Sequence, residues 1–448
     1  MIKPDQLSWN RKAGYAVGDF ALNLFYTFCT LFLLYYYTDV LGLSPTNAGF
    51  VIMAALLIEG VLDPLMGFVT NRTRSPFGRY RPYLLFGALP LCLSFVSMFI
   101  PTGLSGAPLL AYVMGTHLLF RTIYTVVGIP YNALSAELTI DSQQRSEIAG
   151  LRMVFALACA LLLATATLPL SSWFGGGQIG FFWLSAIYAL IAFFIFLLCF
   201  KATREASDVR QESPSIGAML SMLRANWPLQ LILVATIFAS VGSTLANKTL
   251  IYYLKYYAGS EAAVTPALTI FAASAGLAVP FWVLLIGKWS KRVVWLIASA
   301  VVIINYLIIF AVAPSVGPPL WILLCIHGIG NGAFPIAYWA MIPDTVEFGE
   351  WKTGIRAEGA IYGLVSLTQK IALGVGVGML GLLLDAIGYA PNTPQSGATL
   401  DGIKVLLTLA PATLVAITGG IIWAYPLDHK LHGRLARALA WRGIRSGT

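Results

Sequence analysis

The sequence is poor in charge. Only 10% of its 448 residues are Asp, Glu, Lys or Arg, whereas soluble domains carry about 25%. Hydrophobic residues make up 58% of the chain, a composition typical of a protein that lives in lipid. This shortage of charge excludes an ordinary soluble domain, and we expect membrane lipids to surround the chain.

Cysteine and histidine are also scarce. The five cysteines fall in separate apolar runs and none has a CxxC partner, so neither a disulfide framework nor a zinc site is indicated. The four histidines are scattered, and no metal cluster or nucleophile–base pair is evident. They are His117, His327, His429 and His432. We therefore expect no cofactor and no enzymatic activity.

Long polar segments are few, and apolar runs of about 20 residues fill most of the chain. The runs lie at 13–38, 45–70, 82–101, 107–131, 148–171, 179–200, 229–257, 264–287, 293–313, 318–342, 359–388 and 402–425. The N-terminus lacks a short apolar stretch before a cleavage site, so no signal peptide is expected. The pattern predicts an all-α membrane protein with 12 transmembrane helices.

One longer polar segment divides these spans into two sets of six. We predict an N-terminal half at 1–200, a central cytoplasmic loop at 201–228, a C-terminal half at 229–426 and a basic tail at 427–448. The first span contains TLFLLYYYTDVLG and the seventh contains TLIYYLKYYAG, with similar aromatic spacing. Two parallel repeats of this kind are a known transporter plan.

Basic residues are distributed unevenly along the chain. Most of the 28 Lys and Arg residues fall in the termini and in alternate loops, whereas loops such as PTGLSGAP and APSVGPP hold none. Basic loops mark the cytoplasmic side, so we expect both termini in the cytoplasm. The net charge of +9 is then an orientation signal, and nucleic acid is not an expected partner.

The basic tail also contains spaced apolar residues, namely Leu431, Leu435, Leu439 and Trp441. This pattern is typical of a helix on the inner membrane surface. A solvated tail is the alternative.

A few charges lie within the spans, where each costs at least ~2.5–3.5 kcal/mol and is therefore a functional candidate. The acids are Asp19, Glu59 and Asp63, and the bases are Arg121, Arg152, Lys248 and Lys370.

Glu59 and Asp63 are one helical turn apart and point to the same side of their helix. In a poorly hydrated site, one of them keeps its proton or a cation lies between them. This chemistry suits a coupling site for H⁺ or Na⁺, and Thr125 could add a hydroxyl ligand for Na⁺. Alternatively, the pair only locks its helix to Arg121 or Arg152 through salt bridges.

The intramembrane bases outnumber the acids. If Arg121 or Lys248 faces a cavity unpaired, it favours an anionic substrate such as a carboxylate or sulfonate; structural pairing is the alternative. Tyr26, Tyr124 and Trp339 offer aromatic faces for a sugar, although packing or an interfacial belt also explains such residues.

The short segment PDTVEFGEWKTGIRAEG (343–359) is unusually rich in charge for a loop. Its acids could pair with the basic residues 72–81 of another cytoplasmic loop and so form a charge latch between the halves. Ordinary solvated loop charge is the alternative.

Several motifs occur in order along the chain: GDFALNLFY, YYYTDVLGLS, DPLMGFVTNRTRSPFGRYRPYLLFG, YTVVGIPYNAL and PDTVEFGEWKTGIRAEG. From about Leu7 to Pro426 the sequence resembles the glycoside–pentoside–hexuronide:cation symporters. This branch of the major facilitator superfamily includes the melibiose permease. The resemblance implies a carrier that moves a sugar with Na⁺, H⁺ or Li⁺ by alternating access. We expect it to lie in the bacterial inner membrane and to function as a monomer. Related lipid carriers share the acidic motif, so a cation-coupled carrier of lysolipids or other amphiphiles is the alternative.

The resemblance also implies residue roles by motif position. A sugar site is expected around Asp19, Tyr26, Tyr124, Arg152 and Lys370. A cation site is expected at Glu59, Asp63 and Thr125.

The sequence departs from the galactoside carriers of this family. Gly128 and Asn132 stand where those carriers have a second sugar-binding acid and a tryptophan, and Gly18 stands where they have lysine. Leu62 replaces an amide that can add an oxygen to the cation site, which favours H⁺ over Na⁺. We still expect Gly128 and Asn132 to line the substrate site. The segment 343–359 looks similar to that of carriers of glucuronides and sulfonated sugars, and together with Arg121 and Lys248 it favours an acidic sugar, either a hexuronide or a sulfonated sugar.

Overall fold

The computed structural model describes residues 7–139, 142–205, 216–355 and 358–427, and these residues form helices and connecting turns without any strand. The predicted all-α fold is confirmed. The tail residues Leu431, Leu435, Leu439 and Trp441 lie outside the described residues, as does residue 356–357 of the charged segment.

Membrane-spanning helices match the predicted runs closely. Eleven helices of the described chain are long and apolar enough to cross a membrane, and a shorter apolar helix, Arg81–Ser97, stands at the remaining predicted span. That span was predicted to reach residue 101, but its helix ends at Ser97. Pro101 explains part of the difference, because a residue that precedes proline is disfavoured in helical conformation.

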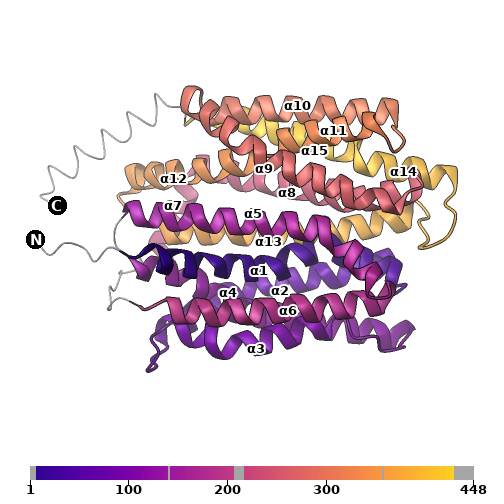
Figure 1. The fold of residues 1–448 in the computed structure, drawn as a ribbon. Coiled ribbons are helices and arrows are strands. Elements are labelled where there is room, and N and C mark those ends of the chain that lie inside the picture. Colours follow the sequence, from indigo (N-terminus) through magenta and orange to yellow (C-terminus); the bar gives the residue numbers. More distant parts are fainter. Residues whose placement is uncertain (1–6, 140–141, 206–215, 356–357, 428–448) are drawn as a thin grey trace, which may run out of the picture. The chain divides into compact units, whose positions relative to one another are not determined.

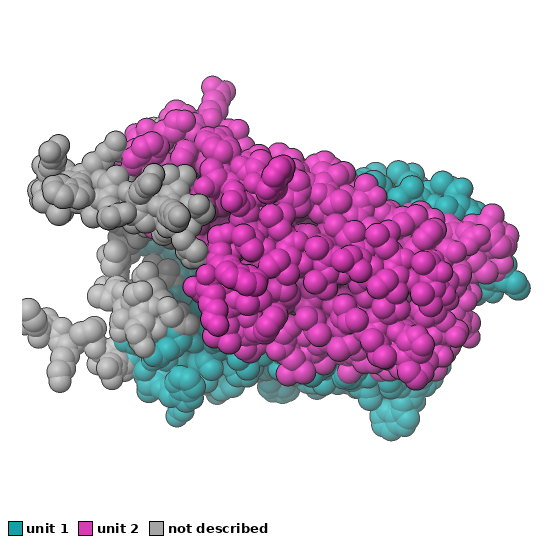
Figure 2. Space-filling view, turned by 90° about the horizontal axis from the view of Figure 1, so that it is seen from above, with its two compact units in different colours: residues 1–209, 377–394 teal, residues 210–376, 395–448 magenta. Residues whose placement is uncertain are grey.

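Contacts divide the chain into two compact units, coloured separately in Figure 2. Unit 1 comprises Met1–Val209 and Val377–Pro394, and unit 2 comprises Arg210–Gly376 and Gln395–Thr448. The final turns of the eleventh predicted span therefore belong to unit 1.

Unit 1 is built from α1 (Trp9–Tyr35), the π-helical turn η1 (Tyr36–Val40), α2 (Pro45–Arg72), α3 (Arg81–Ser97), α4 (Gly106–Leu138), α5 (Ser142–Trp173) and α6 (Gly177–Ala202). Helix α1 packs along α5 and α6, α2 packs along α4, and α3 contacts both α4 and α6 (Figure 1). Ser44 caps α2 by accepting a hydrogen bond from the amide of Asn47 (3.3 Å), and Pro45 fits the first helical turn.

Unit 2 is built from α7 (Ile216–Ala225), α8 (Trp227–Tyr252), η2 (Tyr253–Tyr257), η3 (Glu261–Ala263), α9 (Val264–Lys288), α10 (Lys291–Val312), α11 (Pro318–Asn331), α12 (Ala333–Thr353), most of α13 (Glu358–Ala386), α14 (Gly397–Leu407) and α15 (Leu409–Trp423). Helix α8 packs on α15, α9 packs on α11, and α10 contacts both α11 and α15.

The two similar aromatic segments adopt the same local structure. Helices α1 and α8 each continue into a five-residue π-helical turn, η1 and η2. Each turn closes with a matching backbone bond of 2.9 Å, from the amide of Leu43 to the carbonyl of Tyr37 and from that of Ser260 to Leu254. Both turns are followed by a glycine at positive φ, Gly42 and Gly259. This agreement supports the predicted repeat.

The charged segment 343–359 was expected to be a loop, but helix α12 continues through it to Thr353. Asp344 is buried there and accepts hydrogen bonds from the Lys291 ammonium at 2.7 and 2.8 Å. Lys291 also donates to the carbonyl of Ala340 (2.7 Å). Lys291 therefore balances the charge of Asp344 inside unit 2.

Candidate functional site

Two acids on α2 face two polar residues on α4, one helical turn apart on each helix. Arg121 donates from Nη1 to Oε2 of Glu59 at 2.9 Å, and Thr125 donates to Oδ1 of Asp63 at 3.1 Å. Residues four apart lie on the same face of a helix. Glu59 therefore lies opposite Arg121, and one turn further along Asp63 lies opposite Thr125. The structure thus brings the expected cation-site residues Glu59, Asp63 and Thr125 to one helix interface.

The Glu59–Arg121 ion pair is almost completely buried, with side-chain exposures of 0% and 4%. Asp63 is only partly buried. A buried pair tolerates the loss of either partner poorly, because the remaining charge is left uncompensated. The sequence left open whether Arg121 faces a cavity or pairs with an acid, and the structure shows it paired.

A histidine that was not predicted as a site residue lies one turn further along this interface. His117 is fully buried on α4, and its Nε2 accepts a hydrogen bond from Nε of Arg121 (3.2 Å). Since Nε2 acts as an acceptor, His117 is neutral with its proton on Nδ1. Its position four residues before Arg121 is the signal that sequence reasoning could have used.

The expected sugar-site residues of unit 1 form a second polar cluster. Arg152 on α5 donates to Oδ1 of Asp19 on α1 through Nε (3.2 Å) and Nη2 (2.8 Å). The same Nη2 donates to Oδ1 of Asn132 on α4 (2.6 Å). Three helices therefore supply a carboxylate, a guanidinium and an amide within hydrogen-bonding distance of one another.

A pair of stacked tyrosines supports the Arg152 guanidinium. The rings of Tyr15 and Tyr131 lie 4.8 Å apart, and the guanidinium carbon lies 5.8 and 5.2 Å from their centroids. Each tyrosine hydroxyl donates to the other residue's backbone carbonyl, at 2.8 and 3.0 Å. These reciprocal bonds fix the rings, and the cation–π contact then restricts Arg152.

Gly18 lies against this tyrosine pair. A Cβ added at Gly18 would meet Cε2 of Tyr131 at 2.5 Å and Sγ of Cys199 at 3.3 Å. A side chain such as the lysine of galactoside carriers would therefore displace Tyr131. Gly128 differs, because an added Cβ meets only Cε1 of Tyr124 at 3.8 Å, an ordinary contact distance.

The rings of Tyr26 and Tyr124 lie side by side in unit 1. Tyr26 lies on α1 and Tyr124 on α4, and their rings are 6.5 Å apart at 27°. Tyr124 lies one residue before Thr125, and Tyr26 lies two turns after Asp19 on α1. On α4, Tyr124 therefore lies between Arg121 and Thr125, the two partners of the acid pair.

The remaining predicted residues belong to unit 2. Lys248 is buried on α8, and Lys370 is partly buried on α13. Trp339 on α12 is 44% exposed and stacks on Tyr362 of α13 at 6.3 Å and 12°. The exposed indole face is suited to a sugar ring.

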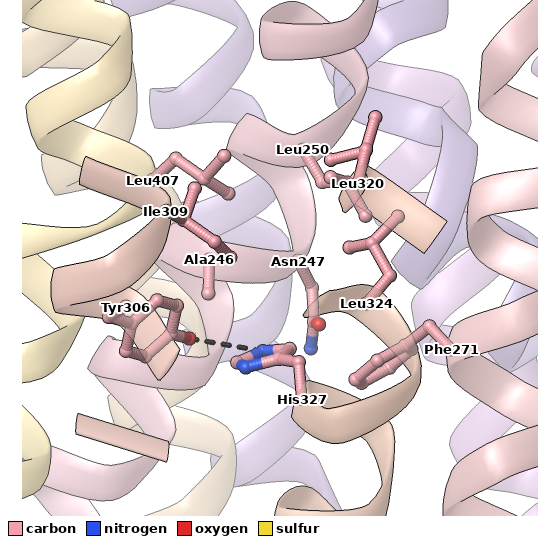
Figure 3. Close-up of a pocket in the computed structure, with 10 residues that line it drawn as sticks. All are labelled: Ala246, Asn247, Leu250, Phe271, Tyr306, Ile309, Leu320, Leu324, His327 and Leu407. Atoms are coloured by element: carbon pink, nitrogen blue, oxygen red, sulfur yellow. Dashed lines mark hydrogen bonds between the residues drawn. The ribbon is translucent and has the colours of Figure 1, made fainter. Parts of the chain in front are cut away.

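Unit 2 contains a small cavity of about 20 Å³ lined mainly by apolar residues (Figure 3). Its polar side is formed by His327, whose Nε2 lies 3.2 Å from the hydroxyl of Tyr306, and by Asn247. Asn331 lies 3.1 Å from the same Nε2. A cavity of this size holds about one water molecule, so it cannot hold a sugar.

Comparison with known proteins places the chain in a family. Residues 14–429 match the family described as MFS/sugar transport protein. The chain belongs to this family. The Uncharacterized symporter YnaJ of Bacillus subtilis (strain 168) is 32% identical over 97% of this chain and 95% of the relative. The Glucuronide carrier protein homolog of Escherichia coli (strain K12) is 30% identical over 95% of this chain and 94% of the relative.

Solved structures agree with the family at the level of the fold. Nucleoside transporter NupG has a TM-score of 0.68 at 12% identity, with coverage of 94% of this chain and 100% of that chain. The major facilitator fold and the resemblance to the glycoside symporters are confirmed. As a member of this family the chain is a membrane transporter and not an enzyme.

Proposed function

We propose that the chain moves a sugar or glycoside together with a cation, by alternating access, and that the preferred substrate is an acidic one such as a hexuronide. Membership of the sugar transport family supports the transport of a sugar. The name of the glucuronide carrier homolog supports the acidic class. The clusters of unit 1 supply the residue roles, as follows.

Spare hydrogen-bonding capacity in the Asp19–Arg152 pair is the observation on which the substrate proposal depends. Both bonds to Asp19 end on Oδ1, and Arg152 donates only through Nε and Nη2. Among the described residues, Oδ2 of Asp19 and Nη1 of Arg152 make no hydrogen bond. Oδ2 is an acceptor for sugar hydroxyls, and Nη1 is a charged donor for a carboxylate or sulfonate.

Further residues are proposed to bind the substrate together with the Asp19–Arg152 pair. Asn132 accepts a hydrogen bond from Nη2 of Arg152 and keeps its own amide nitrogen for a ligand. We assign Tyr26 on α1 and Tyr124 and Gly128 on α4 to the same substrate site. In unit 2, we assign substrate-binding roles to Trp339 and Lys370. Carboxylate, guanidinium and amide groups favour a hydrophilic ligand over a lysolipid, whose acyl chain would gain nothing from them.

The coupling role is assigned to Asp63. Its carboxylate is partly buried, it accepts a hydrogen bond from Thr125, and α2 and α4 place it within the same unit as the sugar cluster. We propose that cation binding at Asp63 and sugar binding at Asp19–Arg152 are both required for the loaded carrier to change conformation.

Vesicle transport tests this assignment. Cells or vesicles with the protein should accumulate p-nitrophenyl β-D-glucuronide under an imposed cation gradient, and more strongly than the matching β-D-glucoside. Asp63→Asn should abolish accumulation. Counterflow of labelled against unlabelled glucuronide needs no cation gradient and should persist, because the neutral asparagine mimics Asp63 with its charge balanced by a bound cation. Asp401→Asn is the matched control, because Asp401 is 70% exposed and only pairs with Lys404 within α14; it should transport normally.

Two outcomes would contradict the proposal. Unchanged accumulation in Asp63→Asn would remove the coupling role of that residue. Transport of lysophospholipid, with no saturable uptake of either glycoside, would favour the amphiphile carrier instead.

A further inference from the structure

Arg121 takes a place that the resemblance assigns to an external cation. Its Nη1 lies 2.9 Å from Oε2 of Glu59, and its Nε is bound to His117 at 3.2 Å. Arg121 is 3% exposed, so its charge is buried together with these two contacts. The guanidinium is therefore a fixed positive charge at the acid pair.

The donor set at this site does not fit Na⁺. A hard alkali cation requires several oxygen ligands, and the expected set consists of Glu59, Asp63 and Thr125. The Glu59 carboxylate is already bound to Arg121, so its negative charge is already balanced. A Na⁺ shared by the two acids would also lie next to the guanidinium. Repulsion between unit charges about 4 Å apart at an effective dielectric of 20 weakens binding on the order of 10²–10³-fold.

We propose that Arg121 is the residue that determines ion specificity: it is a resident counter-ion of Glu59 that keeps Na⁺ out of the acid pair. Transport is then independent of Na⁺, and the same repulsion disfavours Li⁺, which leaves H⁺ of the three cations that the resemblance implies. His117 is a positioning residue, because it holds Nε and so directs Nη1 toward Glu59. This inference rests on the proposed function, since it names the ion class of the same site.

Sodium binding to the purified protein tests the inference without any sugar. We would measure ²²Na⁺ binding and thermal unfolding in NaCl against choline chloride at equal ionic strength. The wild type should show no specific Na⁺ response. Arg121→Ala should bind Na⁺ and gain about 2–4 °C in melting temperature on addition of saturating Na⁺.

Matched variants separate charge from packing. Arg121→Lys keeps a positive charge near Glu59 and should remain unresponsive to Na⁺. Glu59→Gln/Arg121→Ala lacks the freed carboxylate and should lose the Na⁺ response that Arg121→Ala gains. If Arg121→Ala does not fold, Arg121→Gln replaces it, because the glutamine amide donates to Glu59 without a charge.

Each result decides the inference. Specific Na⁺ binding by the wild type that Glu59→Gln abolishes would overturn it. A folded Arg121→Ala or Arg121→Gln that shows no Na⁺ response would also overturn it. Failure of glucuronide counterflow in the wild type would instead contradict the proposed function, and the Na⁺ binding result would be unaffected.

Discussion

Units 1 and 2 each bury a histidine in the fourth span of their half, His117 on α4 and His327 on α11, and the two histidines have different surroundings. In both, Nε2 lies within hydrogen-bonding distance of the residue four positions later, Arg121 at 3.2 Å and Asn331 at 3.1 Å. In unit 1 that residue, Arg121, also donates a hydrogen bond to the carboxylate of Glu59. In unit 2 the imidazole instead contacts a tyrosine hydroxyl and a phenylalanine ring. The same local arrangement therefore holds a charge in unit 1 and only neutral groups in unit 2.

Ion pairs follow the same division. In unit 1, Glu59–Arg121 and Asp19–Arg152 join positions well inside apolar helices. In unit 2, Lys291 at the start of α10 binds Asp344 in the middle of α12. We propose from this difference that the charges of unit 1 bind an ion, whereas the Lys291–Asp344 pair of unit 2 fastens α10 to α12.

The largest difference in stability between the two units is expected when the residue four positions after each histidine loses its side chain. Arg121→Ala leaves Glu59 buried without its counter-ion and should lower the free energy of unfolding by about 3–5 kcal/mol. Asn331→Ala removes only neutral hydrogen bonds and should cost about 0.5–1.5 kcal/mol per bond. Thermal unfolding in one detergent, with the double variant Glu59→Gln/Arg121→Gln as control, measures both. Equal losses in the two units would break the comparison.

Arg152 and Lys291 should separate substrate binding from helix fastening. Arg152→Gln removes the charged donor for an acidic substrate and should weaken binding of p-nitrophenyl β-D-glucuronide roughly 10- to 100-fold, since a hydrogen bond to a charged group contributes about 1.5–3 kcal/mol. Lys291→Gln should reduce thermal stability and leave glucuronide affinity within about twofold, a negligible difference in free energy. Titration of tryptophan fluorescence with the glucuronide reports the affinity.

The comparison would fail if Lys291→Gln lost glucuronide affinity as strongly as Arg152→Gln. It would also fail if Arg152→Gln kept the affinity of the wild type. Arg152→Lys sharpens the result, because lysine keeps the charge but loses the planar fork and should fall between the two.

Much of the fold could be predicted because its signals are local. A run of about 20 apolar residues marks a span wherever it occurs, and the spans agree with the observed helices. The helical repeat likewise predicted that Glu59 and Asp63 share a face, as Arg121 and Thr125 do. Helix α12 was missed beyond the predicted span because a charged stretch such as 343–353 also suits a loop.

The pairing between faces could not be predicted, because it depends on how α2, α4 and α5 align when they pack. The sequence offered Arg121 or Arg152 as partners for the acid pair, and the structure uses Arg121 there. The Tyr15–Tyr131 stack was missed for the same reason, since its members are 116 residues apart and follow no common spacing. The contact between His117 and Arg121 could have been predicted, because the two residues are four positions apart on one helix.

The smallest expected effect tests whether the histidine of unit 2 has any part in transport. Tyr306→Phe removes the hydroxyl that lies 3.2 Å from Nε2 of His327 and should cost about 0.5–1.5 kcal/mol of stability. Because Asn331 remains within reach of the same nitrogen, the imidazole should keep its place. Glucuronide counterflow and accumulation should then match the wild type when they are normalised to folded protein. If accumulation were lost while counterflow persisted, the neutral cluster of unit 2 would take part in coupling, and the assignment of ion chemistry to unit 1 alone would be wrong.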